Sequence, residues 1–360
     1  MIPIAKPLIS REEKNAVLEV LDSGMLAQGK KVAEFERLFS QFIGVKYAIA
    51  TSNGTTALHA ALVAHNIKDG DEVITSPFSF VATANTIAMT GAHPVFVDID
   101  EKTCNLDPNL IEAAITPKTK AIMPVHLYGQ AADMDKIQAI AKKHNLIIIE
   151  DACQAHGAEL GGKKVGSFGT GCFSFYATKN ITTGEGGMIT TSDDHIAKTL
   201  RKIISHGSEQ RYYHDFVGYN YRMTDIAAAI GIEQLKKLDT FNAIRKKNAT
   251  YLNQNLKNLK GIIMPEITPH HVFHQYTIRI TSECRKSRDQ IIAQLAQEHI
   301  ASSIFYPIPI HRQNAYQHYH HLQFPVAEKI ATEVLSLPVH PGLGESDLHK
   351  IVETMQKIIP

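Results

Sequence analysis

The chain is poor in several features that would point to particular classes of protein. Its 360 residues contain no tryptophan, and lysine plus arginine (37) almost balance aspartate plus glutamate (36). A formal net charge of +1 gives none of the basic field that binds nucleic acid or an anionic membrane surface. The four cysteines form no C-x-x-C pair, so we expect reduced thiols and no disulfide framework.

Long apolar runs and metal motifs are also missing. No stretch approaches the roughly 20 apolar residues of a membrane-spanning helix, and MIPIAKPLISREEK at the N-terminus lacks the apolar core of a signal peptide. We therefore expect a cytoplasmic protein that binds neither membrane nor nucleic acid. Histidines gather late in the chain, in HHVFH and HYHH, but no cysteine or carboxylate stands at ligand spacing and H-E-x-x-H is absent, so no metal is expected.

Short β-branched runs alternate with longer helical patterns in the first half of the chain. The expected strands are residues 47–51, 72–76, 93–97, 121–125, 146–150, 171–175 and 187–191. The helical patterns between several of them are residues 55–65, 80–89, 108–114 and 134–144. This order predicts an α/β fold, in which helices flank a large, mostly parallel, seven-stranded sheet.

A change of pattern predicts a second unit. A long helical pattern over residues 232–259 leads out of the sheet region, and after Pro265 the chain reads as a strand (HVFHQYTIRI) and then a helix (SRDQIIAQLAQEHI). We expect a large domain over residues 1–244, including an N-terminal segment, and a smaller α+β domain over residues 245–360.

One lysine stands in an uncharged, glycine-rich loop. Residues 173–187 read FSFYATKNITTGEGG, with Lys179 in the middle. A protonated lysine is a poor nucleophile, whereas a partly desolvated lysine can condense with an aldehyde. Taken alone, Lys179 is better explained as a surface lysine on a turn.

An aspartate ends an apolar strand about thirty residues earlier, in LIIIEDACQAHG. Asp151 would lie at the carboxyl edge of the sheet, where open α/β folds bind ligands. A carboxylate there needs a cation or hydrogen-bond donors. A protonated pyridine nitrogen is one such cation, and capping of a following helix is the alternative. Lysine and aspartate together are what pyridoxal phosphate (PLP) chemistry requires.

Three further segments fit a phosphate and a planar ring. In YAIATSNGTTALHAAL, Gly54 and Thr55 fall at the start of a helix, where free amides bind anions, although a simple N-cap explains them too. Ser174 lies five residues before Lys179 and is a candidate donor to the same phosphate. Phe80, in SPFSFVATAN, is a candidate for stacking on a ring or for the core.

Together these segments resemble the DegT/DnrJ/StrS family of PLP-dependent nucleotide-sugar aminotransferases, within the aspartate aminotransferase superfamily (fold type I). The resemblance covers essentially the whole chain. Its markers are SNGTTAL, SPFSFVATAN, PVHLYGQAADMD, IEDACQAHGA, FSFYATKNITTGEGG, GYNYRMTDIAAAIG and IFYPIPIH. It implies PLP as cofactor and transfer of an amino group from an amino acid such as L-glutamate to a keto-sugar.

The resemblance also implies roles for particular residues. Lys179 is similar to the lysine that binds the cofactor and moves the proton, Asp151 to the partner of the pyridine nitrogen, and Gln154 to the donor to the phenolic oxygen. Phe80 resembles the stacking ring. The residues similar to phosphate ligands are Gly54, Thr55 and Ser174.

Other residues resemble parts of the family's substrate site and dimer interface. Asn220, in GYNYRM, is similar to a residue that reaches the phosphate from the neighbouring subunit, which implies a homodimer with shared active sites. Tyr306 and His311 would lie beside the sugar.

Two alternatives stay open. One is another PLP reaction, such as aldol cleavage or the sugar dehydration of a branch with histidine at the lysine position. The other is a non-catalytic regulatory or binding relative. Lysine at position 179 favours transamination.

Overall fold

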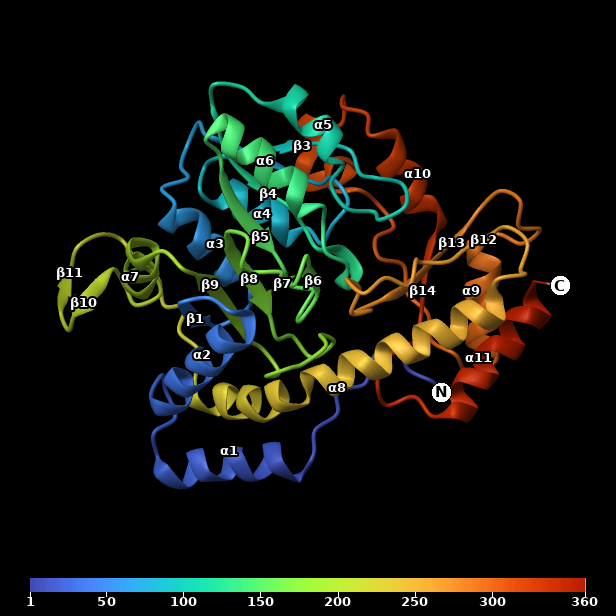
Figure 1. Ribbon diagram of the computed structural model, residues 1–360, viewed down its shortest axis with the longest axis horizontal. Helices are drawn as coiled ribbons and strands as arrows, with labels where there is room; N and C mark the ends of the chain where they lie inside the picture. Colours follow the sequence, from blue (N-terminus) through green and yellow to red (C-terminus); the bar gives the residue numbers. More distant parts are fainter. Residues whose placement is uncertain (360) are drawn as a thin grey trace.

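The computed structural model describes residues 1–359, and a seven-stranded sheet lies at its centre (Figure 1). Its strands are β1 (Tyr47–Thr51), β2 (Glu72–Thr75), β3 (His93–Phe96), β4 (Thr119–Met123), β5 (Ile147–Asp151), β8 (Thr170–Ser174) and β9 (Gly187–Thr191). The spatial order is β1-β9-β8-β5-β4-β2-β3. β9 is antiparallel to both neighbours and the remaining pairs are parallel, so the expected mostly parallel sheet is confirmed.

Helices cover both faces of the sheet because its strands are apolar on both sides. On β1, Ile49 packs with α3 and α7, whereas Ala48 and Ala50 pack with α2 and α8. The helices of this part are α1 (Arg11–Ser23), α2 (Lys30–Ile43), α3 (Gly54–Ala64), α4 (Ala82–Met89), α5 (Pro108–Ile111), α6 (Met134–His144), α7 (Asp194–Ile203) and α8 (Asp225–Leu256). Short elements complete it: η1 (Glu112–Ala114), η2 (Leu127–Gly129), β6 (Glu159–Leu160), β7 (Lys163–Lys164), β10 (Ser208–Gln210) and β11 (Tyr213–His214).

A second group of elements lies at the far end of α8 (Figure 1), and its buried side chains form a second core. It contains the antiparallel strands β12 (Ile262–Ile263), β13 (Tyr276–Ile280) and β14 (Val334–Leu337), with α9 (Arg288–Gln297) and α11 (Glu345–Ile358). The remaining elements of this half are η3 (Ile310–Arg312), η4 (Asn314–Tyr319) and α10 (Pro325–Glu333).

The boundary expected between residues 244 and 245 falls inside α8, which is one unbroken helix. Phe241 belongs to the core beside the sheet and Ala249 to the second core, so the helix passes from one core to the other. Ile2 packs in the second core, and Ala327 of α10 packs against Phe78 of the sheet region. We retain 1–244 and 245–360 as a proposed division, with residue 360 outside the described residues.

Across residues 1–359, no helix has both the length and the apolar character needed to cross a membrane.

Candidate active site

A cavity of about 640 Å³ opens at the carboxyl edge of the sheet. Its walls come from the segments that follow four strands: 53–56 after β1, 79–83 after β2, 151–154 after β5 and 174–179 after β8. Residues 274–275 and 305–306 close it from the C-terminal half. The carboxyl ends of neighbouring strands meet at one edge of a sheet, which is why segments far apart in sequence share this cavity.

Eight of the ten expected site residues line this cavity. They are Gly54, Thr55, Phe80, Asp151, Gln154, Ser174, Lys179 and Tyr306. The two that do not are Asn220 and His311.

The start of α3 forms one wall. Asn53 caps the helix: its Oδ1 accepts from the Thr56 amide at 2.9 Å, and Thr56 Oγ1 accepts from the Asn53 amide at 3.1 Å. The first intrahelical bond runs from the Ala57 amide to the Asn53 carbonyl, so the amides of Gly54 and Thr55 precede it. These two amides are the donors that a helix start offers to an anion.

Gly54 permits a close approach between α3 and β8. A Cβ at position 54 would lie 2.6 Å from Ser174 Cβ and 3.1 Å from Cys153 Sγ, which is too close for any other residue without movement. The Ser174 hydroxyl is thereby brought against the helix start. Two backbone amides and a hydroxyl in this cradle form a donor set that fits a phosphate group.

Asp151 is a buried carboxylate without a cationic partner. It is 5% exposed; Thr83 Oγ1 donates to its Oδ2 at 2.7 Å and the Cys153 amide to its Oδ1 at 3.2 Å. None of the salt bridges within residues 1–359 involves Asp151. A buried charge of this kind is costly unless a ligand supplies the opposite charge. The alternative role as an N-cap is not seen, since a turn and no helix follows β5.

Lys179 lies in a loop whose conformation is stabilised by hydrogen bonds from polar residues of the same loop. Thr182 Oγ1 donates to the Phe175 carbonyl at 2.8 Å and accepts from the Gly184 amide at 2.8 Å. Burial lowers the pKa of Lys179, and the nearby Cys153 and Asp151 oppose that shift. A lowered pKa increases the fraction of neutral amine, which is the nucleophilic and basic form.

Gln154 and Tyr306 form a polar wall. Gln154 Oε1 accepts from the Tyr128 amide at 2.9 Å, and its Nε2 donates to the Tyr306 hydroxyl at 3.2 Å. The Tyr306 ring lies 6.2 Å from the Phe80 ring. Phe80 is 56% exposed, so its ring is available to a planar ligand and does not belong to the core.

Asn220 and His311 lie elsewhere in the chain's own structure. Asn220 is exposed and pairs through its backbone with Ser205. His311 is fully buried; its Nε2 lies 2.9 Å from Glu328 Oε1 and its ring packs on Phe324. Its side chain therefore faces α10 and not the cavity.

The sequence reasoning missed several residues that line the cavity or support it. Thr83, His274 and Gln275 line it, and Tyr128 holds Gln154 from behind. Thr83 lies three residues after Phe80 in the segment SPFSFVATAN, which was an available signal. No comparable signal marks Tyr128.

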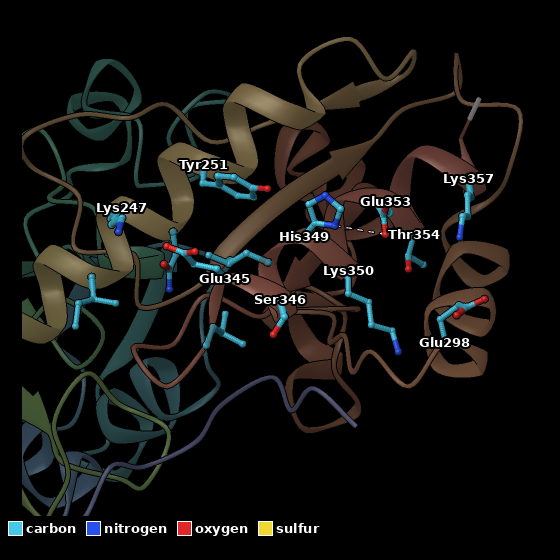
Figure 2. A pocket seen from close by; sticks show the side chains of 14 residues that line it. Lys247, Tyr251, Glu298, Glu345, Ser346, His349, Lys350, Glu353, Thr354 and Lys357 are labelled. Carbon is cyan, nitrogen blue, oxygen red and sulfur yellow. Dashed lines mark ion pairs between the residues drawn. The ribbon is translucent and has the colours of Figure 1, made fainter.

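A larger groove of about 940 Å³ lies between α8 and α11. Figure 2 shows that its walls carry basic and acidic side chains together, among them Lys247, Lys350 and Glu353. None of the ten expected site residues lines it. The chemistry therefore points to the smaller cavity.

Known proteins resemble the chain along nearly all of its length. The model of the DegT/DnrJ/EryC1/StrS aminotransferase family matches residues 7–356. The chain is 44% identical to GDP-perosamine synthase of Caulobacter vibrioides over 99% of this chain and 98% of the relative. It is 45% identical to the "pleiotropic regulatory protein" of Geobacillus stearothermophilus over 93% and 91% of the two chains. The structure of NtdA from Bacillus subtilis with bound cofactor PMP matches with a TM-score of 0.91 and 34% identity, over 97% of this chain and 81% of that chain.

Proposed function

The chain belongs to the DegT/DnrJ/EryC1/StrS aminotransferase family, and on that premise we propose that it uses PLP at Lys179 to aminate a nucleotide-linked keto-sugar. Family membership confirms the resemblance read from the sequence, the type I fold and the assignment as a sugar aminotransferase. The residue roles, the cofactor's place and the exact substrate are the proposal.

One observation carries the proposal. Asp151 is a buried carboxylate that faces the same cavity as Lys179 and forms no salt bridge within residues 1–359. A protonated pyridine nitrogen would supply the missing charge. The cradle of the Gly54 and Thr55 amides and the Ser174 hydroxyl fits the phosphate of the same molecule.

PLP, when bound, would supply an electron sink for the negative charge that develops on the substrate carbon as it loses its proton. The chain's own residues then have defined tasks. Asp151 would keep the pyridine nitrogen protonated, and Phe80 would offer a ring face for stacking. Lys179 Nζ would take the proton from the α-carbon of the amino donor, and in the second half-reaction it would deliver a proton to the sugar carbon that receives the amine. Its lowered pKa suits this work because the amine must be neutral to accept a proton.

Gln154 and Tyr306 contribute donors to the same cavity. With Gln154 Oε1 occupied by the Tyr128 amide, Nε2 is the group that faces the cavity and Tyr306. We assign Gln154 to the cofactor's phenolic oxygen and Tyr306 to the sugar side. His311 is not assigned to the sugar, because its ring is bonded to Glu328.

The partner and the location belong to the same proposal. Asn220 is exposed and lies outside this chain's own cavity, which supports a homodimer in which the partner subunit brings it to the phosphate. Mixing Lys179→Ala and Asn220→Ala proteins, each impaired alone, should restore part of the activity; no recovery would contradict shared sites. The four cysteines are free thiols, and on that ground we propose a cytoplasmic location.

The experiment uses the purified protein loaded with PLP. Borohydride reduction and peptide mapping should place the label on Lys179. In a separate, unreduced sample, glutamate alone should change the cofactor absorbance. A panel of nucleotide keto-sugars, tested with glutamate and followed by mass spectrometry, should identify the aminated product, the nucleotide and the carbon that is aminated. Label at another residue would overturn the proposal.

The panel also separates the alternatives. Unchanged absorbance with glutamate, together with loss of water from a keto-sugar, would indicate dehydration. A protein that takes up no PLP would indicate a regulatory relative, the class that the name of the Geobacillus protein denotes. Double-reciprocal plots of the rate against one substrate, measured at several concentrations of the other, should give parallel lines, because the amino group is transferred in two separate half-reactions.

A further inference from the structure

Tyr128 contacts three walls of the cavity without lining it. Its amide donates to Gln154 Oε1 at 2.9 Å, its carbonyl accepts from the Gln275 amide at 3.1 Å, and its hydroxyl donates to the Phe305 carbonyl. Gln154, Gln275 and Phe305 all line the cavity, and Tyr128 does not. Tyr128 itself is buried, at 6% exposed.

The backbone of Tyr128 is in an unusual conformation. Its φ of 57° and ψ of 3° lie in the left-handed region, which a bulky residue seldom occupies. Such a conformation persists only where the surroundings hold it, and it recurs at functional sites. Here the neighbouring Gly129 carbonyl accepts from the Val272 amide at 2.8 Å, so the whole turn is tied to the entry of β13.

The contact to Gln154 settles the direction of its side-chain amide. Because Oε1 accepts from a backbone N–H, Nε2 must be the end that meets Tyr306. The Tyr306 oxygen accepts from Nε2, so its own proton is free to point into the cavity. If the amide were reversed, Tyr306 would donate to Gln154 and the cavity would lose both donors.

We propose that Tyr128 is a positioning residue that sets the direction of two hydrogen-bond donors in the cavity, Gln154 Nε2–H and Tyr306 O–H. The contacts form a closed set, since Tyr128 holds Gln154 on one side and the Phe305 carbonyl next to Tyr306 on the other. The arrangement belongs to the apoprotein, and its effect on the reaction rests on the proposed function.

The first test needs neither cofactor nor activity. Urea unfolding of the apoprotein is compared for Tyr128→Phe, Tyr306→Phe and the double variant. Because both residues belong to one closed set, the shift of the midpoint in the double variant should be smaller than the two single shifts added. Tyr316→Phe is the matched control: the Tyr316 hydroxyl also donates from a buried ring, to Asn85 Oδ1 at 2.7 Å, outside the cavity. Its shift should add fully to that of Tyr306→Phe.

The second test uses the loaded enzyme. Loss of one buried hydrogen bond should lower kcat/KM of Tyr128→Phe by about fivefold, and Tyr316→Phe should keep the wild-type value. Tyr128→Phe keeps the backbone amide that holds Gln154, so the pH midpoint of the cofactor absorbance should stay at the wild-type value, and the loss of activity should come from Tyr306, whose neighbouring Phe305 carbonyl has lost its donor. Full additivity in the apoprotein, or identical kinetics for the two variants, would overturn the proposal. If the protein bound no PLP, the proposed function would be refuted but the role of Tyr128 would not, because urea unfolding of the single and double variants tests that role in the apoprotein.

Discussion

Replacing Gly54 by alanine tests the phosphate cradle through its closest contact. The new methyl group would stand 2.6 Å from Ser174 Cβ, and neither atom is the far end of a flexible side chain. The first turn of α3 must therefore move away from β8, or Ser174 must turn. Either movement separates the Ser174 hydroxyl from the Gly54 and Thr55 amides.

Two effects on stability oppose each other. Overpacking of this size typically costs about 1–3 kcal/mol, whereas alanine in place of a helical glycine gains about 0.5–1 kcal/mol. We expect the apoprotein to lose about 1 kcal/mol in free energy of unfolding. The affinity for PLP should fall by about tenfold to a hundredfold, since hydrogen bonds to a charged group contribute about 1.5–3 kcal/mol.

Equilibrium dialysis or absorbance titration of the apoprotein with PLP measures the affinity, and urea unfolding measures the stability. Gly344→Ala is the matched control, because the nearest atoms to a Cβ there lie 3.8 Å away and the residue is outside the cavity. Ser174→Gly removes the opposing Cβ, so Gly54→Ala should have a smaller effect in that background. The proposed phosphate cradle would be refuted if Gly54→Ala kept the wild-type affinity for PLP. It would also be refuted if the effects of Gly54→Ala and Ser174→Gly on affinity and stability added fully in the double variant.

Two more predictions concern buried charge. In Asp151→Asn the free energy of unfolding of the apoprotein should stay level or rise, because a buried carboxylate without a salt bridge is removed. The kcat of the loaded enzyme should fall by about a hundredfold or more. A large loss of apoprotein stability in urea would contradict this account of Asp151. Burial lowers the pKa of His156 from 6.5 to about 3, so below pH 6.5 only the unfolded chain gains a proton there and stability falls as the pH falls. At pH 5 this should lower the free energy of unfolding of the wild type by about 2 kcal/mol. In His156→Phe, whose ring would lie beside Phe173 and Phe175, the free energy of unfolding measured in urea should fall by about 2 kcal/mol less than in the wild type between pH 7.5 and pH 5. Equal losses in the two proteins would contradict the prediction.

The sequence predicted those parts of the fold that depend on local pattern. Each of the seven strands of the sheet was expected, because short β-branched runs between helical patterns leave little choice of structure. The order of the strands was not predicted, since it depends on contacts between distant segments. The expected domain boundary falls inside α8 because the sequence shows one uninterrupted helical pattern there. Which core the helix faces changes between Phe241 and Ala249, and that change depends on contacts with distant segments.

The cavity shows the same division between local and distant information. Gly54, Asp151 and Lys179 lie at or shortly after strand ends, where a mostly parallel sheet gathers distant segments, and the resemblance to the family joined them into one expected site. His311 was expected beside the sugar from its motif, but its direction depends on Glu328, which lies on α10 and gives no sign of the contact in the sequence.

Tyr128 is the clearest case of information that a residue type does not carry. Two of its three contacts with the cavity wall use backbone groups, which every residue except proline possesses. A positive φ is expected of glycine or asparagine, so a tyrosine at position 128 does not indicate a left-handed backbone conformation. Residues that contact the cofactor or substrate can be predicted from their type and their place in the sequence. Residues that position them through backbone contacts can be identified only from the structure.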